Sequence, residues 1–240
     1  MLPATHDTGS AVLAVPSLKE NTLYISSGTW SLLGVEQKEP ICTEESRQAN
    51  FTNEGGYAYR YRYLKNIMGL WMIQSVRREL PEHYSFSELC DLARESQAFP
   101  SRVDVNADVF LAPESMINAI QLECARTMQP VPQTPGELAE VIYQSLAESY
   151  AKAIKELERL TGIPYDEIHI VGGGSNAEYL NELTAEKSGL RVLAGPAEAT
   201  AIGNLAAQMI AAGVFADYRE ARTCILQSCE VKCYSRTSIA

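Results

Sequence analysis

The chain has 240 residues, of which 46% are hydrophobic, and this is enough for one large domain with its own core. Thirty acidic residues against 20 lysines and arginines give a formal net charge of -10, which disfavours a broad nucleic-acid-binding surface. The apolar runs are too short to span a bilayer and no charged-then-apolar leader begins the sequence, so we expect no membrane attachment. Six cysteines without a C-x-x-C pair favour reduced thiols in a cytoplasmic protein over a zinc site.

The stretch THDTGSAV, residues 5–12, places Asp7 between a histidine and a Thr-Gly-Ser run. Such a run is compatible with the catalytic loop of an aspartic protease, with the phosphate loop of an actin-like ATPase, or with a helix start that bears a cap or a catalytic base. The first two require a buried strand before the aspartate, and residues 1–6 (MLPATH) do not form an apolar run. A protease also needs a second carboxylate, and no second D-T-G occurs. We therefore expect a helix that begins at Asp7 and has its apolar body at residues 11–15.

Two β regions are expected next. Residues 22–35 (TLYISSGTWSLLGV) predict two short strands around a turn at residues 26–29. In residues 51–64, tyrosines alternate with other residues, so that tyrosines would line one face of a strand and arginines the other. Interleaved aromatics and arginines can bind nucleic acid, but in so acidic a chain a half-buried strand is the better interpretation. These side chains are Tyr57, Tyr59, Tyr61, Tyr63, Arg60 and Arg62.

Helical patterns dominate the middle of the chain. Residues 68–80 and 85–95 predict two helices, and residues 134–160 predict the longest one. Thr134 and Glu137 form a T-x-x-E capping box at its start, with proline at the first helical position. Its apolar residues recur at spacings of three and four, which predicts a helix that packs along one face.

A strand–helix–strand–helix pattern follows, over residues 167–171, 176–188, 190–194 and 197–213. This alternation predicts parallel strands at the centre of a sheet, with ligands near their carboxyl ends. Because no repeat, low-complexity tract or long linker interrupts the chain, we expect one α/β domain with a mixed sheet over residues 1–240. The small residues of the last helix allow close approach either to a packed element or to an adenine ring.

The loop VGGGSN follows the first of these strands. Glycines 172–174 allow a ligand to approach the backbone because they carry no Cβ, and Ser175 or Asn176 would cap the next helix. The letters also satisfy the dinucleotide pattern G-x-G-x-x-A, but the next strand does not end in the acidic residue which that pattern requires. No P-loop sequence occurs. The loop is compatible with a nucleotide site and with a purely structural turn.

Five motifs occur in a fixed order: THDTGSAV, YISSGTWSLLG, YLKNIMGLWMIQ, VGGGSN and GPAEATAIGN. Together they resemble the C-terminal half of the FGGY carbohydrate kinases, in their rhamnulokinase branch, from Thr5 to about residue 215. The resemblance implies the C-terminal domain of a two-domain kinase with the actin-like ATPase (ribonuclease H-like) fold, in which helices flank a mixed sheet. ATP and the sugar would bind in the cleft between the domains.

The resemblance also implies roles for individual residues. Asp7 matches the general base of the family. One departure lies beside it, because the family motif commonly reads H-D-T-A and this chain has Gly9, which we expect to loosen the first helical turn. The matching sugar-binding positions are His6, Thr8 and Asn66, and the matching ATP-binding positions are Thr29, Gln74, Gly172 and Gly173.

The resemblance further implies ATP and Mg²⁺ as cofactors and L-rhamnulose as the sugar, with L-fuculose as an alternative ketose. The N-terminal kinase domain, which would supply the phosphate loop and much of the sugar pocket, is not in the sequence. We therefore expect Asp7 to lie where the second domain begins, and the isolated chain to be inactive. A non-catalytic binding or regulatory remnant of a kinase is the alternative function.

Overall fold

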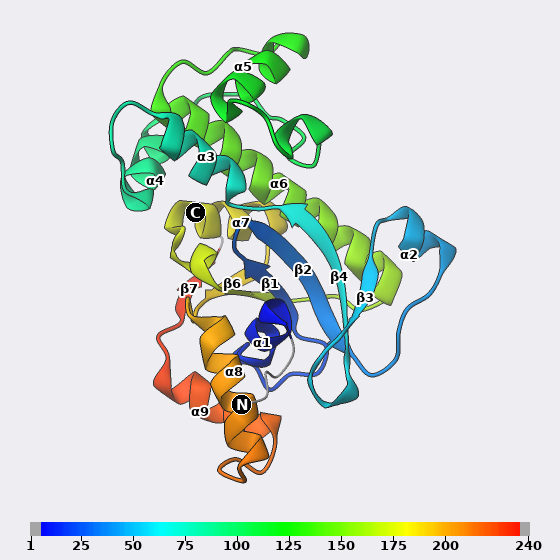
Figure 1. Cartoon of the computed structure of the whole chain (residues 1–240). Helices are drawn as coiled ribbons and strands as arrows, with labels where there is room; N and C mark the ends of the chain where they lie inside the picture. Colours follow the sequence, from blue (N-terminus) through cyan, green and yellow to red (C-terminus); the bar gives the residue numbers. More distant parts are fainter. Residues whose placement is uncertain (1–5, 236–240) are drawn as a thin grey trace, which may run out of the picture.

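A seven-stranded mixed sheet runs through the molecule in the order β3-β4-β2-β1-β5-β6-β7 (Figure 1). The computed structural model describes residues 6–235. Strands β3, β4, β2 and β1 pair antiparallel, β1, β5 and β6 pair parallel, and β7 is antiparallel to β6. The strands are β1 (Leu23–Ser27), β2 (Trp30–Gln37), β3 (Thr52–Gly55), β4 (Tyr61–Met68), β5 (Glu167–Val171), β6 (Arg191–Ala194) and β7 (Lys232–Tyr234).

Helices cover both faces of the sheet. Successive side chains of a strand point to opposite faces, and β1 shows this directly. Leu23 and Ile25 pack in the core under α6 (Pro135–Thr161) and α7 (Glu178–Ser188), whereas Tyr24 packs in a second core under α1 (Asp7–Leu13), α8 (Ala199–Ala211) and α9 (Tyr218–Ser228). The parallel strands are thus buried on both sides, and all five residues of β5 are buried, Glu167 and His169 included.

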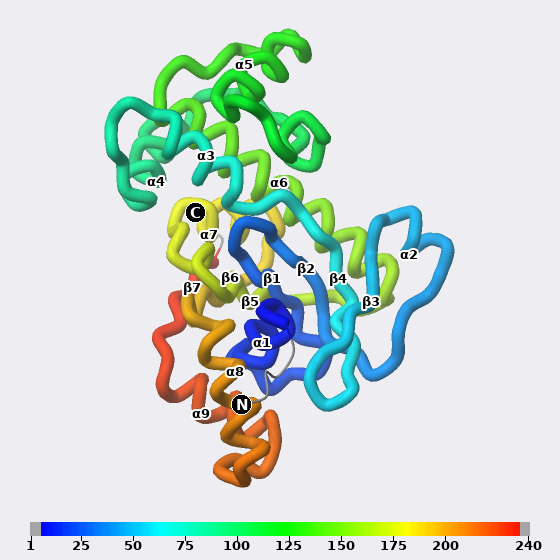
Figure 2. The backbone as a smooth tube through the Cα atoms, in the orientation of Figure 1, coloured from blue at the N-terminus to red at the C-terminus, as the bar shows by residue number. Residues whose placement is uncertain are grey.

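A helical cap lies beyond the end of the sheet at which β4 ends (Figure 2). It contains α3 (Trp71–Glu79), α4 (Phe86–Glu95), the short turn η2 (Asp108–Phe110) and α5 (Met116–Arg126). Helices α3 and α4 pack on α6, and α5 packs on α3 and η2. Glu79 joins two of these helices, because its carboxylate accepts hydrogen bonds from the Ser115 hydroxyl and the Met116 backbone N–H, both at 2.7 Å. The remaining short elements are α2 (Glu44–Gln48), η1 (Tyr57–Tyr59) and η3 (Gly173–Asn176).

The long helix confirms its sequence signals. The Thr134 hydroxyl accepts from the Glu137 N–H at 3.2 Å, and the Glu137 carboxylate accepts from the Thr134 N–H at 3.0 Å. The helix ends at Gly162, whose φ of +70° favours glycine. The strands and helices predicted after it are present too, with β1 adding a parallel pair to β5. Among residues 6–235, the structure contains no helix long and apolar enough to cross a membrane.

The predicted alternation of tyrosines and arginines holds within β4, where Tyr61 and Tyr63 share a face opposite Arg62, but is wrong for residues 57–60. The chain turns sharply before β4, and Ala58 and Tyr59 both have positive φ there, so the strand period is interrupted. Tyr59 is fully exposed, Tyr63 is buried in the core, and Arg62 is buried rather than on a polar face. Because β4 continues to Met68, the next helix begins at Trp71 rather than at residue 68.

The predicted cap of α7 is also wrong. Ser175 and Asn176 lie in the turn η3, and α7 begins at Glu178 after Ala177, a residue with no side chain that could cap a helix. Ser175 is buried, and its carbonyl accepts a hydrogen bond from the Asn181 amide at 2.9 Å. The glycines before it pack so closely on β1 that the chain makes this extra turn before it can enter the helix.

Candidate active site

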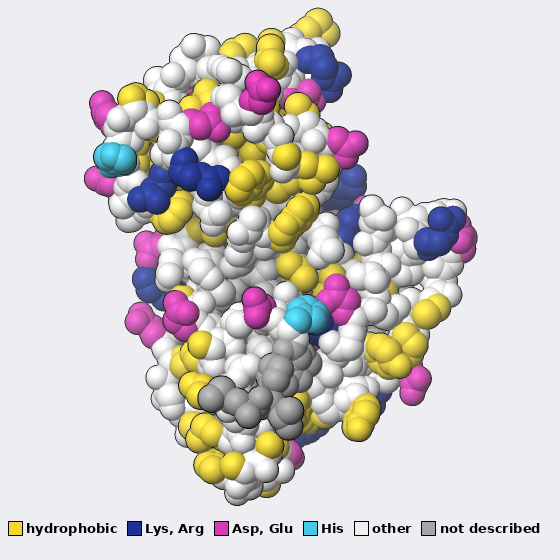
Figure 3. Space-filling model, viewed as in Figure 1, with side chains coloured by type: hydrophobic (Ala, Val, Ile, Leu, Met, Phe, Trp, Pro, Cys, Tyr) yellow, Lys and Arg dark blue, Asp and Glu magenta, His cyan; other side chains and the backbone are white. Residues whose placement is uncertain are grey.

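The exposed carboxylate at the start of α1 belongs to Asp7, the first residue of that helix. His6 precedes it as the N-cap residue and is also exposed, and Thr8 follows, half-buried. The rest of α1 is buried, including Gly9 and all of residues 11–15. The polar start of a buried helix therefore lies at the surface, and Figure 3 shows acidic side chains and a histidine together on this face.

Helix α8 packs closely on α1, with the backbone of Gly203 against the backbone of Ser10 and Ala14. A Cβ on Gly203 would lie 1.8 Å from the Ser10 carbonyl oxygen, so only glycine allows the two helices to approach in this way. The Thr200 hydroxyl donates to the Asp7 carbonyl at 3.4 Å. The absence of a side chain at Gly203 therefore allows α1 and α8 to pack closely. The first turn of α1, which contains Asp7, is bonded to α8 through Thr200.

A row of alternating charges lies under α1, across strands β3, β4 and β2. In the strand register, Arg62 is opposite Glu54 on one side and Glu36 on the other. Arg62 Nη2 lies 2.9 Å from Glu54 Oε2, and Arg222 Nη2 from α9 lies 2.5 Å from Glu36 Oε2. The side chains of both arginines are at most 4% exposed. The row could not be predicted from the sequence, because its members are neighbours only across strands.

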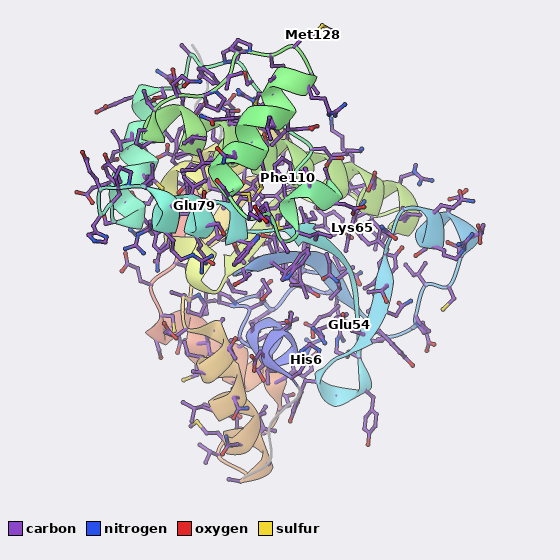
Figure 4. The ribbon with its side chains drawn as sticks, turned by 45° about the horizontal axis from the view of Figure 1, so that its top comes forward. His6, Glu54, Lys65, Glu79, Phe110 and Met128 are labelled. Atoms are coloured by element: carbon purple, nitrogen blue, oxygen red, sulfur yellow. The ribbon has the colours of Figure 1, made fainter. Side chains whose placement is uncertain are left out.

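The two arginines of this row contact opposite ends of α1. Arg222 donates to the carbonyls of Val12 and Leu13, at 2.9 and 3.1 Å, and so satisfies acceptors that a helix end leaves without partners. Arg62 Nη2 lies 2.6 Å from His6 Nε2 at the other end. Figure 4 shows His6 and Glu54 side by side at the entrance to this region. The helix that carries Asp7 is thus fixed at both ends.

Asn66 lies on the same face of β4 as Arg62, because the two residues are four apart in a strand of period two. It is exposed, opposite Leu32 of β2. Lys65 points to the other face, where its ammonium group pairs with Glu156 of α6 at 2.7 Å. The structure therefore places Asn66 on the α1 side of the sheet, with the other predicted sugar-binding residues.

The predicted ATP-binding residues gather at the carboxyl ends of β1 and β5. Thr29 is exposed in the turn between β1 and β2. The Thr29 and Gly28 carbonyls accept from the Trp71 and Leu70 N–H groups, at 3.2 and 2.9 Å, so the start of α3 is bonded to this turn. Gln74 follows in the first turn of α3, half-buried.

The glycine loop packs against the same end of β1. Gly172 has a φ of +87°, and a Cβ there would lie 2.8 Å from the Ser27 carbonyl oxygen. A Cβ on Gly174 would lie 1.9 Å from the Ser27 hydroxyl. A Cβ on Gly173, in contrast, meets no atom of the described residues within 4 Å. One side of the loop is therefore pressed on the strand, and the other is open for a ligand to lie against backbone.

A pocket of about 340 Å³ adjoins the loop, between η3, the end of β6 and the start of α8. Its walls combine the backbone around Gly195 and Pro196 with the apolar side chain of Ile202, and the charged residues Glu198, Glu230 and Lys232 also line it. The Pro196 carbonyl accepts from the Gly172 N–H at 3.0 Å, which fixes the pocket to the glycine loop. A concave site that combines apolar and polar lining beside an open glycine backbone fits a nucleotide.

Residues 23–212 of the chain match the protein-family model described as "FGGY family of carbohydrate kinases, C-terminal domain". This chain belongs to the FGGY family of carbohydrate kinases.

Curated relatives agree with this assignment. The chain is 50% identical to the rhamnulokinase of Oceanobacillus iheyensis over 239 residues, which are 100% of this chain and 50% of that protein. It is 48% identical to the rhamnulokinase of Bacillus subtilis (strain 168), over 100% of this chain and 49% of that protein. The chain thus spans about half the length of the curated relatives it matches.

Solved structures show the same fold. A xylulose kinase from Rhodospirillum rubrum aligns with a TM-score of 0.66 at 13% identity, over 97% of this chain and 46% of that one. A Plasmodium falciparum glycerol kinase with ADP aligns with a TM-score of 0.65 at 11% identity, over 94% and 45%. The actin-like ATPase fold expected from the motifs, with a mixed sheet and flanking helices, is confirmed.

Proposed function

We propose that the chain is the C-terminal, base-bearing and nucleotide-binding domain of a cytoplasmic rhamnulokinase. The complete enzyme transfers the γ-phosphoryl group of ATP to L-rhamnulose and releases ADP and L-rhamnulose 1-phosphate. The observation that carries this proposal is the exposed Asp7 carboxylate at the start of a helix fixed at both ends, in a chain similar over its whole length to rhamnulokinases.

Asp7 is the general base of the proposed reaction. The attacking sugar hydroxyl must lose its proton as its oxygen bonds to phosphorus, and a carboxylate within hydrogen-bond reach can accept that proton. A base of this kind must be held in place while the sugar binds, and the contacts to both ends of α1 provide this. His6, Thr8 and Asn66, on the same side of the sheet, orient the sugar.

ATP supplies the phosphoryl group, and we assign its site to the carboxyl ends of β1 and β5. The open side of Gly173 fits a phosphate chain that lies against backbone N–H groups, and the exposed Thr29 hydroxyl offers one more donor. Gln74 and Gly172 complete the set, and the neighbouring pocket has room for part of a nucleotide.

Mg²⁺ is proposed as the metal of the reaction. Residues 6–235 contain no group of three or more His, Cys, Asp or Glu side chains that could hold a metal ion. Mg²⁺ needs no such group, because it is commonly bound through one or two carboxylates together with substrate phosphates. The relatives are about twice as long as this chain, and we assign the remaining carboxylates, the phosphate loop and much of the sugar pocket to an N-terminal kinase domain.

A chimera tests the proposal. This chain would replace the matching half of the Oceanobacillus iheyensis rhamnulokinase, whose own activity serves as the reference. We expect ATP-dependent phosphorylation of L-rhamnulose by the chimera and none by the isolated chain. A folded chimera without sugar kinase activity would favour a non-catalytic remnant, and faster turnover of L-fuculose than of L-rhamnulose would assign the other ketose.

The nucleotide site is tested on the chain by itself. MgADP at 100 times its dissociation constant should add about 2.7 kcal/mol to the free energy of unfolding, which raises the thermal midpoint by roughly 5–10 °C. Gly172→Asp and Gly173→Asp should each abolish this increase, because they place a carboxylate where phosphates would lie. Gly213→Asp is the matched control, since Gly213 also has a positive φ but lies at the far end of α8. An increase that survives all three substitutions would exclude the glycine loop.

A further inference from the structure

Arg62 lies beneath the start of α1 with only 1% of its side chain exposed. Its Nε donates to the Gly55 carbonyl at 3.1 Å. Its Nη2 lies 2.9 Å from Glu54 Oε2 and 2.6 Å from His6 Nε2. A single guanidinium nitrogen therefore joins the half-buried Glu54 to the residue directly before the proposed base.

The chemistry of these two groups determines where the imidazole proton lies. A guanidinium has only donors, so a nitrogen at hydrogen-bond distance from Nη2 must be an acceptor. An imidazole nitrogen accepts only when it carries no proton. The short contact with Arg62 therefore requires His6 Nε2 to be unprotonated and places the ring proton on Nδ1.

We propose that Arg62 is a positioning residue of the kinase reaction: it fixes the tautomer and orientation of His6 and thereby holds the first turn of α1, with Asp7, in register with the sugar. Its role in catalysis rests on the proposed function, whereas its control of the tautomer does not. Glu54 contacts both Arg62 and His6 and belongs to the same group of interacting side chains. Its carboxylate compensates the buried charge of Arg62, and its Oε2 also lies 3.4 Å from His6 Nε2.

Replacing Arg62 should change His6 Nε2 from a hydrogen-bond acceptor to a donor. In Arg62→Met the only charged group of this row still next to His6 Nε2 is the Glu54 carboxylate, which can only accept. The imidazole should then place a proton on Nε2 and donate to Glu54. Arg62→Lys retains a donor at the same depth and should retain the wild-type tautomer.

The first experiment is imidazole ¹⁵N NMR on the chain, which has only three histidines. The His6 signals are assigned by their loss in His6→Gln. We expect an unprotonated Nε2 in the wild type and in Arg62→Lys, and a protonated Nε2 in Arg62→Met. The control is Arg47→Met, which removes an exposed arginine paired with Glu44 and should leave His6 unchanged. A protonated Nε2 in the wild-type chain would overturn the proposal without any variant.

The second experiment measures kcat and KM in the chimera. A misplacement of about 1 Å can cost about 10²-fold in rate, so we expect Arg62→Met to lower kcat by about that factor with the KM for ATP unchanged, and Arg62→Lys to recover part of the loss. Wild-type kcat in Arg62→Met would overturn the positioning role. A chimera with no kinase activity whose chain still shows the tautomer change would refute the proposed function and leave the tautomer assignment intact.

Discussion

Asp7→Asn in the chimera is expected to lower kcat for L-rhamnulose by about 10²- to 10⁴-fold, the usual contribution of a general base. Asparagine has almost the same shape as aspartate but cannot accept the proton of the sugar hydroxyl. Because Asp7 is exposed and its side chain lies at the beginning of α1, the substitution removes no core contact. The KM for ATP and the stabilisation by MgADP should therefore remain near their wild-type values.

The matched control for this experiment is Asp91→Asn. Asp91 is an exposed aspartate of α4 that pairs with Arg94, so the same change of one atom is made in a helix away from α1. Its kcat should equal that of the unmodified chimera. If Asp7→Asn and Asp91→Asn had the same kcat, Asp7 would not be the base, and the helix start would be only a structural feature.

The elements that the sequence predicted well are those whose determinants are local. The capping box of Thr134 and Glu137 lies within four residues, and the apolar stripe of α6 repeats at every turn, so each signal is complete in one segment. The same holds for the start of α1, which was predicted because the sequence before Asp7 (MLPATH) contains no apolar run. The candidate site could be proposed because its motifs match a family in a fixed order.

The parts that were missed depend on residues far apart in the chain. Arg62 was expected on the face opposite the tyrosines of a half-buried strand, but its neighbours across the strand pairs, Glu54 and Glu36, come from two other strands. Its burial therefore depends on strand order, which the alternation of tyrosines does not specify. The tight turn at Ala58 and Tyr59 breaks that alternation through positive φ angles, and neither residue type signals them.

Arg222→Met is expected to cost about 3–5 kcal/mol in the free energy of unfolding, the usual loss when one partner of a buried ion pair is removed. The substitution leaves the buried Glu36 carboxylate without its partner and removes the donors to the Val12 and Leu13 carbonyls. For a chain of this size the thermal midpoint should fall by roughly 6–20 °C. Urea unfolding of the chain measures the free energy directly.

Arg219→Met separates this contact from a general effect of charge on α9. Arg219 lies on the same helix, is exposed, and pairs with Glu20 at 2.7 Å, and exposed pairs contribute only about 0–1 kcal/mol. Equal losses in the two variants would show that the buried contacts of Arg222 with Glu36 and with the end of α1 add nothing to stability. If Arg222 and Glu36 act as a pair, Glu36→Gln combined with Arg222→Met should destabilise by less than the sum of the single effects, because each substitution alone already removes the ion pair. The bonds from Arg222 to the Val12 and Leu13 carbonyls remain a separate contribution, and through them the helix that carries Asp7 is held by a residue more than 200 positions away in sequence.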